Sequence, residues 1–290
     1  MQDAYDFVLM GPVGFIGAAI LKSLESAGYK TLATRMRLQD RMGFEKLLDE
    51  NRPKIGVICA AGERGRPNIS WCDSHPVETL DANITCQFGI AAACKARGLH
   101  CVLIGTAIIY EPFPDNPSYR FKEEDPPNVK DPGVYTALRI KQEELLKYFD
   151  NVLTLRVLYP VSNDLDPRGL IGKLARFKRV DKVRTSVTIF ESLCPLIPEL
   201  CKRGSTGVLN FAASGTVSYV DIIEELAKRA PPGWTPPPFS EGAGRAAPEL
   251  DVARLAAASG QPVPDATETV RRIIRTMPEA ELAQLLRSAL

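Results

Sequence analysis

Three glycines near the start of the chain have the spacing that pyrophosphate binding requires. Gly11-Pro12-Val13-Gly14-Phe15-Ile16-Gly17 follows the apolar run 7–10, and Ile16, Ile20 and Leu24 then recur at helical spacing. A strand that turns sharply into a helix leaves bare backbone amides at the helix N-terminus, where a pyrophosphate can approach. Glycines also occur in other tight turns, but this placement between a strand and an amphipathic helix predicts dinucleotide binding. The predicted cofactor contacts are Gly11, Gly14, Phe15, Ile16 and Gly17.

The residues after the second predicted strand, 29–34, bear on which dinucleotide is bound. An acidic residue here suits the ribose 2′-hydroxyl of NAD, whereas a basic residue suits the 2′-phosphate of NADP. The chain offers Arg35 and Arg37, so we predict NADP(H), with NAD(H) as the other candidate. Both arginines could instead be solvated surface residues. Asp40 either faces the adenine or caps the helix predicted from about residue 42 to 50.

A polar loop follows the third predicted strand, 54–59. The end of this strand is made of small residues, which let a cofactor approach the backbone: Ala60, Ala61 and Gly62. The loop after it carries groups that could bind a phosphate or a sugar: Arg64, Arg66 and Asn68. Asn83 lies inside the helix predicted over 76–97, and we expect it to bond backbone groups near the site.

Two hydroxyl side chains are predicted to meet at the carboxyl edge of the sheet. Thr106 ends the buried strand 100–106, and ligands of parallel sheets bind beyond the carboxyl ends of the strands. Tyr135 and Arg139 are four residues apart in the helix predicted over 135–149, so they project from one face. The proline-rich connection 112–132 between them has the length of a binding loop or lid.

Composition excludes several classes of function. The net charge of the 290 residues is +1, which gives no global field for nucleic acid or an anionic membrane. Two isolated histidines and seven cysteines without a C-x-x-C pair predict no metal site and reduced, buried thiols. Neither a basic leader nor a membrane-spanning apolar run is present, so we expect a cytoplasmic protein with no membrane or nucleic-acid partner.

These elements together predict an α/β fold. We expect a Rossmann-like, doubly wound parallel sheet with a small C-terminal α/β substrate domain. Residues 1–156, with returning segments, would form the NADP-binding domain. Residues 157–290 would form most of the substrate domain and a C-terminal helical cap. Substrate would lie in the cleft between the two.

Four further stretches resemble one enzyme family more closely than the glycines do. They are Gly65-Arg66-Pro67-Asn68 with Trp71-Cys72, Phe121-Lys122-Glu123-Glu124-Asp125, Glu143-Glu144-Leu145-Leu146, and Pro160-Val161-Ser162-Asn163-Asp164-Leu165. Over residues 5 to about 230 the chain resembles an extended short-chain dehydrogenase/reductase. More narrowly, it is similar to the plant-type nucleotide-rhamnose synthases, which are 3,5-epimerase/4-reductases of UDP-4-keto-6-deoxyglucose, and to dTDP-4-dehydrorhamnose reductases.

The resemblance implies roles for individual residues. In such enzymes a Ser or Thr, a Tyr and a Lys four residues after the Tyr carry the hydride chemistry. Thr106 and Tyr135 match this pattern, and Arg139 occupies the position of the lysine. Tyr135 and Arg139 would also contact the cofactor. Lys173 matches the base of the epimerase step, but Ile108 replaces its cysteine acid and has no proton to exchange. We also predict that Asn163 and Asn210 contact the substrate, although Asn210 and Lys173 could each instead be surface polar residues.

We therefore predict an NADPH-dependent reductase of a 4-keto-6-deoxy nucleotide sugar, as in UDP-rhamnose biosynthesis, without a family-type epimerase step. Two alternatives follow from Arg139 and Ile108. One is a catalytically weak, NADP-binding regulatory subunit, similar in kind to the β-subunit of methionine adenosyltransferase. The other is an enzyme of altered chemistry in a biosynthetic pathway. The family also implies a homodimer through the helices predicted at 76–97 and 135–149.

Overall fold

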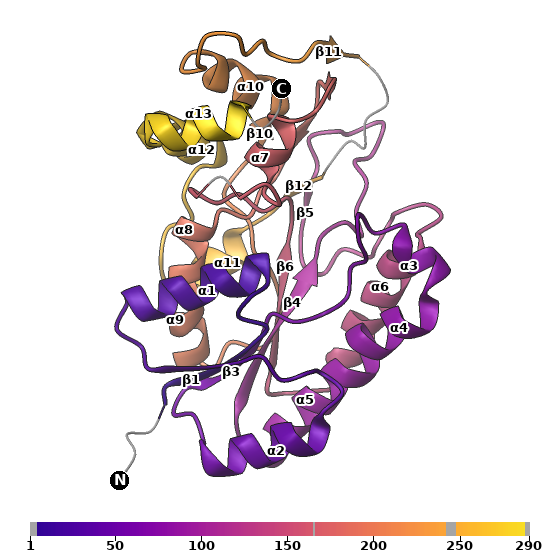
Figure 1. The fold of residues 1–290 in the computed structure, drawn as a ribbon. Coiled ribbons are helices and arrows are strands. Elements are labelled where there is room, and N and C mark those ends of the chain that lie inside the picture. Colours follow the sequence, from indigo (N-terminus) through magenta and orange to yellow (C-terminus); the bar gives the residue numbers. More distant parts are fainter. Residues whose placement is uncertain (1–4, 165, 242–247, 288–290) are drawn as a thin grey trace.

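A six-stranded parallel sheet forms the centre of the molecule (Figure 1). The computed structural model describes residues 5–164, 166–241 and 248–287. All neighbouring strands of this sheet run parallel, in the order β2-β1-β3-β4-β6-β9. Its strands are β1 (Phe7–Met10), β2 (Thr31–Thr34), β3 (Gly56–Cys59), β4 (His100–Thr106), β6 (Val152–Val157) and β9 (Gly207–Asn210).

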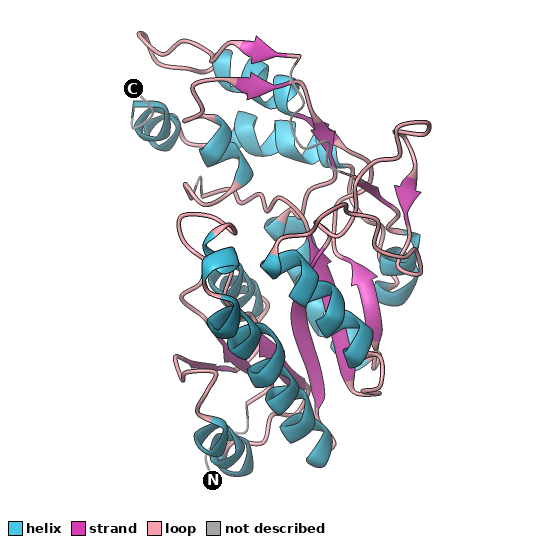
Figure 2. Ribbon diagram, turned by 90° about the vertical axis from the view of Figure 1, so that its right-hand side faces the viewer, coloured by secondary structure: helices cyan, strands magenta, loops and turns pink. Residues whose placement is uncertain are grey.

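Apolar runs without alternation build the strands because helices cover both faces of the sheet (Figure 2). Every residue of β1 and β3 is buried. One apolar cluster joins the sheet to α1 (Phe15–Ser26), α8 (Phe190–Leu193), η2 (Cys194–Leu196), α9 (Ile197–Lys202) and α11 (Ala253–Ser259). A second cluster joins the other face to α2 (Arg41–Glu50), α5 (Cys86–Ala96) and α6 (Val134–Leu146). The predicted doubly wound α/β fold is confirmed.

β1 and β3 are neighbours in the sheet, and the order of strands runs in opposite directions from them: β2 lies beyond β1, whereas β4, β6 and β9 lie beyond β3. Crevices at such switch points, beyond the carboxyl ends of the strands, are where doubly wound sheets bind ligands. The glycine-rich turn follows β1 at this point, and the Ala60-Ala61-Gly62 stretch follows β3. The fold therefore brings the two predicted cofactor segments together.

A smaller lobe with its own apolar core lies above the carboxyl edge of the sheet (Figure 1). Short strands pair within it, β8 with β10 antiparallel and β7 with β11 parallel. Its elements are α7 (Leu170–Leu174), β7 (Val180–Asp181), β8 (Arg184–Thr185), β10 (Val217–Ser218), α10 (Tyr219–Ala227), β11 (Phe239–Ser240), α12 (Ala266–Thr276) and α13 (Glu279–Arg287). Between the lobes, β5 (Arg120–Phe121) pairs in parallel with β12 (Glu249–Leu250).

The helix predicted over 76–97 is interrupted in the structure. After α3 (Trp71–Ser74), the chain forms α4 (Pro76–Leu80), a π-helical turn η1 (Asp81–Thr85) and then α5. Such π-turns often occur at functional sites because the extra residue redirects side chains. Asn83 lies inside this turn. The apolar residues of this segment keep a regular helical spacing along the sequence, so the interruption was not predicted.

All seven cysteines are free and buried, which confirms the predicted buried thiols. Across the described ranges, no helix is long and apolar enough to cross a membrane. In the same ranges, no group of three or more His, Cys, Asp or Glu side chains is placed to hold a metal ion.

Glu225 joins α10 to α12 in the C-terminal lobe, and we predict a pH-dependent contribution to stability. Its buried carboxylate accepts hydrogen bonds from Arg275 Nε at 2.5 Å and Lys228 Nζ at 2.7 Å, which lower its pKa from 4.5 to about 2. Because the folded-state pKa lies below the unfolded one, this contribution is complete above about pH 4.5 and is lost as the pH falls toward 2.

Glu225→Gln is expected to lower the free energy of unfolding by about 1–2 kcal/mol at pH 7. In thermal unfolding measured from pH 7 to pH 3, the difference from the unaltered protein is expected to shrink as the pH falls below 4.5. Glu224→Gln, at the exposed neighbouring position, is the control with no such difference. If Glu225→Gln lowered the stability by the same amount at all pH values, the lowered pKa of Glu225 would be contradicted.

Candidate active site

The glycine-rich turn has no room for side chains at two of its positions. A Cβ on Gly17 would lie 2.0 Å from the Gly11 carbonyl oxygen, so α1 begins directly against the end of β1. Gly11 has φ +75° and a Cβ there would lie 2.9 Å from the Ala61 nitrogen. The first turn of α1 has neither a side-chain cap nor an acidic residue. Its amide groups therefore remain available to an anion, and this cradle fits the diphosphate of a dinucleotide.

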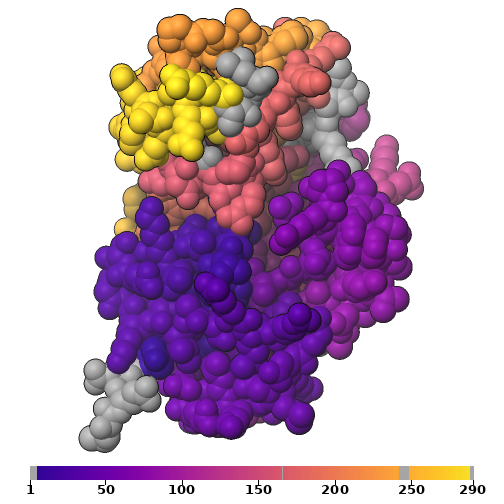
Figure 3. All heavy atoms as spheres, in the orientation of Figure 1, coloured from indigo at the N-terminus to yellow at the C-terminus, as the bar shows by residue number. Residues whose placement is uncertain are grey.

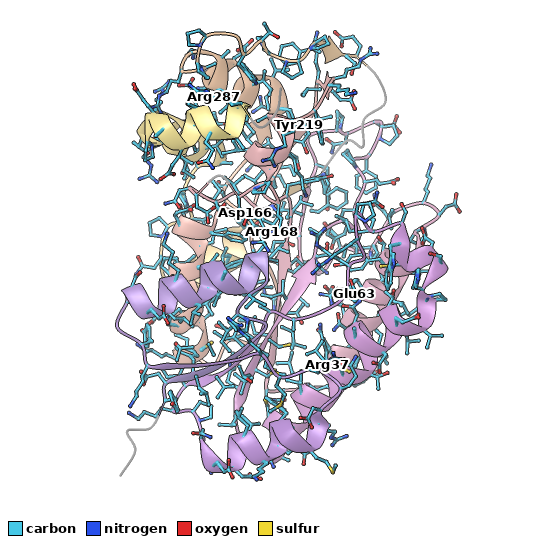
Figure 4. All side chains as sticks on the ribbon, viewed as in Figure 1. Arg37, Glu63, Asp166, Arg168, Tyr219 and Arg287 are labelled. Atoms are coloured by element: carbon cyan, nitrogen blue, oxygen red, sulfur yellow. The ribbon has the colours of Figure 1, made fainter. Side chains whose placement is uncertain are left out.

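The residues after β2 follow the carboxyl end of the strand that pairs with β1. Arg35 and Arg37 are both exposed, and Figure 4 shows Arg37 beside the helices that include α5. Asp40 caps α2, because its Oδ1 accepts the Gly43 N–H at 2.9 Å. Of the two roles predicted for Asp40, the helix cap is thus confirmed. The guanidinium groups of Arg35 and Arg37 have the positive charge and the exposure that binding of a 2′-phosphate requires.

Buried amide side chains form hydrogen bonds to the backbone of the loop after β3. Asn83 accepts the Glu63 N–H at 3.2 Å and donates to the Glu63 carbonyl at 2.6 Å. Gln87 donates to the Ala61 carbonyl at 3.0 Å, and Gln142 of α6 donates to the Gln87 side-chain oxygen at 2.6 Å. The backbone-bonding role predicted for Asn83 is confirmed. Gln87 and Gln142 were missed, since a polar residue inside a helix carries no sign of the partner it meets.

Tyr135 lies on the wall of a cavity of about 380 Å³ at the start of α6. The N-terminus of α6 is held by Asp73 of α3, whose Oδ1 accepts the Val134 N–H at 2.8 Å. Ile108 and Tyr159 line the same cavity. Thr106 ends β4 two residues before Ile108, and its Oγ1 accepts the Ile108 N–H at 3.4 Å. The structure therefore places Tyr135 on the wall of this cavity, and Thr106 at the end of β4 close to it, although Thr106 itself does not line the cavity.

Arg139 lies one turn into α6, with only 6% of its surface exposed. Its Nη2 donates to the backbone carbonyl of Ile104 in β4. Its Nε has no hydrogen-bond partner, and Arg139 takes part in none of the ion pairs formed by the residues that the structure describes. A buried charge without a counter-ion is costly, so this position suits a group that meets an additional polar ligand.

The other predicted residues divide between the cleft and the interior. Lys173 on α7 has its pKa lowered, first by loss of hydration and then by the Arg64 cation. Lys173 is itself exposed at the surface, and the other exposed residues of this set are Arg64, Arg66, Asn68 and Asn163. Asn68 Oδ1 accepts the Ser70 N–H at 2.9 Å, which shapes its own loop. Figure 3 shows the surface hollowed between the segment that contains α1 and the part of the chain that follows β3.

Asn210 does not reach the cleft, contrary to the sequence-based prediction. It is fully buried, and its Nδ2 donates to the carbonyls of Phe121 at 2.8 Å and Asp251 at 3.0 Å. Its N–H also donates to Glu123 at 2.9 Å. These contacts fix β9 to the segments around β5 and β12, and the Asn210 Oδ1, which has no hydrogen-bond partner, is buried with the rest of the side chain.

Comparison with known proteins decides the family. The sequence profile of the NAD dependent epimerase/dehydratase family matches residues 7–160, which is more than half of the chain. The chain belongs to this family. The matched segment contains the glycine-rich turn, Thr106, Tyr135 and Arg139.

Relatives within the epimerase/dehydratase family share most of the chain. It is 37% identical over 238 residues to a bifunctional dTDP-4-dehydrorhamnose 3,5-epimerase/dTDP-4-dehydrorhamnose reductase of Arabidopsis thaliana, covering 81% of this chain and 78% of that protein. A UDP-rhamnose synthase from Acanthamoeba polyphaga mimivirus has the same fold with a TM-score of 0.84, at 24% identity, over 94% of this chain and 100% of the other. A dTDP-4-dehydrorhamnose reductase from Bacillus anthracis in complex with NADP aligns with a TM-score of 0.75 at 15% identity, over 95% and 99%.

The close contact at Gly17 gives a testable difference between two glycines of the turn. Gly17→Ala is expected to lower the free energy of unfolding by about 1–3 kcal/mol, because its methyl group meets backbone that cannot move aside. Gly14 has φ −67°, and its Cβ would approach only the Gly11 carbonyl oxygen, at 3.4 Å. Gly14→Ala is therefore the matched control, with a change of about 0.5 kcal/mol or less in urea unfolding. Equal losses in the two variants would contradict this packing.

Proposed function

We propose that this protein is an NADPH-dependent reductase of a 4-keto-6-deoxy nucleotide sugar, of the kind used to make nucleotide-linked rhamnose. The observation that carries the proposal is the position of Tyr135. Its side chain lines a cavity of about 380 Å³ beside the end of β4, at the sheet edge where the glycine-rich turn opens. A proton donor beside the cofactor crevice is what carbonyl reduction requires.

The relatives support this substrate class and cofactor. The Arabidopsis relative carries both an epimerase and a reductase activity in its name, and the bacterial reductase with this fold binds NADP. In this chain Arg35 and Arg37 supply cations where a 2′-phosphate would lie. The diphosphate would be held by the amides at the start of α1, and Ala61 and Gly62 would adjoin the cofactor on its other side.

Each residue of the site has a distinct task in the proposed reaction. When bound, the nicotinamide supplies a hydride to the carbonyl carbon of the sugar. Tyr135 donates its phenolic proton to the carbonyl oxygen, while the Thr106 hydroxyl hydrogen-bonds to that oxygen and orients it. Arg139 binds the nicotinamide ribose, and its positive charge stabilises the negative charge that Tyr135 acquires as it gives up its proton. Since a guanidinium keeps its proton at neutral pH, the phenol regains its own from water in the cavity.

The proposal does not include epimerisation by the family mechanism. That step removes a proton from one face of the sugar and returns one to the other, so it needs an acid as well as a base. Lys173 has a lowered pKa and suits a base. Ile108, which lines the cavity at the acid's position, has no proton to return. Arg64, Arg66, Asn68 and Asn163 stay proposed contacts for the nucleotide sugar.

One observation favours a second candidate function. The Arg139 guanidinium donates to the Ile104 carbonyl, so part of its hydrogen-bonding capacity serves the fold instead of a ribose. A protein that binds NADPH but does not turn it over, and that regulates a partner enzyme, would tolerate this arrangement. Turnover separates the two candidates.

The first test is to mix the protein and NADPH with UDP-4-keto-6-deoxyglucose, or with its 3,5-epimerised form, and to follow nicotinamide absorbance. Oxidation of NADPH is expected, and Tyr135→Phe is expected to lower kcat by about 100-fold or more because the proton donor is removed. Tyr148→Phe, at an exposed position, is the control that leaves kcat unchanged. If neither the unaltered protein nor Arg139→Lys oxidises NADPH while both bind it, the regulatory candidate replaces the reductase.

We also propose a homodimer through the α4 and α6 side of the molecule. Large apolar side chains are exposed there: Val77, Leu80, Leu145 and Tyr148. Light scattering is expected to give twice the mass of the chain at micromolar concentration, and Leu80→Glu with Leu145→Glu is expected to give a monomer. Phe177→Glu, at an exposed apolar residue of the other lobe, is the control that leaves the mass unchanged. A monomeric unaltered protein would remove the proposal.

A further inference from the structure

A turn of the C-terminal lobe lies directly on the first turn of α1. A Cβ on Gly169 would lie 3.1 Å from Cζ of Phe15, which is the first residue of α1. The guanidinium carbon of Arg168 lies 5.3 Å from the centre of the Phe15 ring. Figure 4 shows Asp166 and Arg168 together above this end of α1, with Glu63 to their right. Arg168 is therefore a cation one aromatic ring away from the amides that the proposed cofactor's diphosphate would contact.

Arg168 is engaged by a carboxylate of its own turn. Its Nε lies 2.8 Å from Asp166 Oδ1, and its Nη2 lies 2.6 Å from Asp166 Oδ2. The Arg168 side chain is 45% exposed and that of Asp166 is 17% exposed. Burial of this pair is thus partial, and apart from Asp166 the guanidinium contacts the ring of Phe15 in α1. Because nearly half of the Arg168 side chain is exposed, an anion can reach its guanidinium.

The Asp166 carboxylate presents two oxygens to the Arg168 guanidinium, as a phosphate group also can. A guanidinium fork binds two oxygens of a carboxylate or of a phosphate in the same planar arrangement. The start of α1 supplies amide donors but no charged side chain of either sign in its first turn. A diphosphate there carries charges that amides alone do not neutralise. Arg168 is the cation that the fold brings to this place from another lobe.

We propose that Arg168 is a positioning residue that exchanges Asp166 for the diphosphate of the bound dinucleotide, and that Asp166 is the anion competing for it. The inference rests on the proposed function only for the identity of the ligand. It assigns opposite effects to the two partners of one ion pair. Loss of the cation weakens dinucleotide binding, whereas loss of the competing charge strengthens it. A pair that only stabilises its turn would give the same sign for both.

The experiment compares Arg168→Gln and Asp166→Asn in titrations of the full-length protein with NADPH and, separately, NADH. Asparagine keeps the side-chain oxygen that accepts the Arg168 N–H at 2.8 Å, so the turn is preserved. Arg168→Gln is expected to raise Kd about tenfold for both dinucleotides, since both carry the same diphosphate. Asp166→Asn is expected to lower Kd about threefold. The dependence of Kd on salt is expected to become less steep in Arg168→Gln, because one charge contact is lost.

Arg97 and Asp49 provide a matched control pair. They form the same fork, with Nε–Oδ1 at 2.7 Å and Nη2–Oδ2 at 2.8 Å, between α5 and α2 at the other end of the molecule. Arg97→Gln and Asp49→Asn are expected to leave both Kd values unchanged. Thermal unfolding of all four variants shows whether each one is folded under the titration conditions.

Three results would overturn the inference. They are Kd changes of the same sign in Arg168→Gln and Asp166→Asn, unchanged Kd values in both, and a loss of UDP binding instead of dinucleotide binding in Arg168→Gln. The last would assign the guanidinium to the diphosphate of the sugar nucleotide. Opposite signs without any turnover would support Arg168 and contradict the reductase. Absence of dinucleotide binding by the unaltered protein would overturn both.

Discussion

The contact between Gly17 and the Gly11 carbonyl is the constraint on which the rest of the site depends. A methyl group at position 17 would lie 2.0 Å from that oxygen, so only glycine lets α1 start against the end of β1. The same closeness leaves 2.9 Å between a Cβ on Gly11 and the backbone of Ala61. Two loops from different strands are thus joined at the switch point of the sheet, and the amides of α1 face the crevice between them.

Amide side chains carry this arrangement across to α6. Asn83 and Gln87 bond the backbone after β3, and Gln142 joins Gln87 to α6. Each group is buried and has its partner, which is the condition under which buried polar networks give rigidity. The helix that bears Tyr135 is therefore positioned by the same side chains that shape the cofactor loop. Arg139 adds a further link through the Ile104 carbonyl of β4.

The sequence predicted those features that depend on neighbours along the chain. The buried strands, the glycine-rich turn and the chamber around Tyr135 follow from apolar runs, spacing and the rule for parallel sheets. Asp40 was left open between two roles because a cap and an adenine contact require the same residue type at the same place. The role of Asn210 was predicted wrongly, since a polar residue at a strand end can face either the cleft or a neighbouring segment. The partners of Asn210 lie 89 and 41 residues away. Arg168 carried no signal, because Phe15 meets it only through the fold.

The attachment of the long connection after β4 affects how material enters and leaves the cavity. Phe121 lies in β5, which pairs with β12, and Asn210 of the central sheet bonds both Phe121 and Asp251. The connection is thus anchored near its midpoint to the sheet and to the C-terminal segment. It cannot swing as one flap. Its second half is also bonded to its first half: the Tyr110 hydroxyl donates to the carbonyls of Lys122 and Asp125, and the Ile109 carbonyl accepts the N–H groups of Asn128 and Val129. Opening the cavity on this side for exchange of substrate and product would therefore break hydrogen bonds between the two halves of the connection.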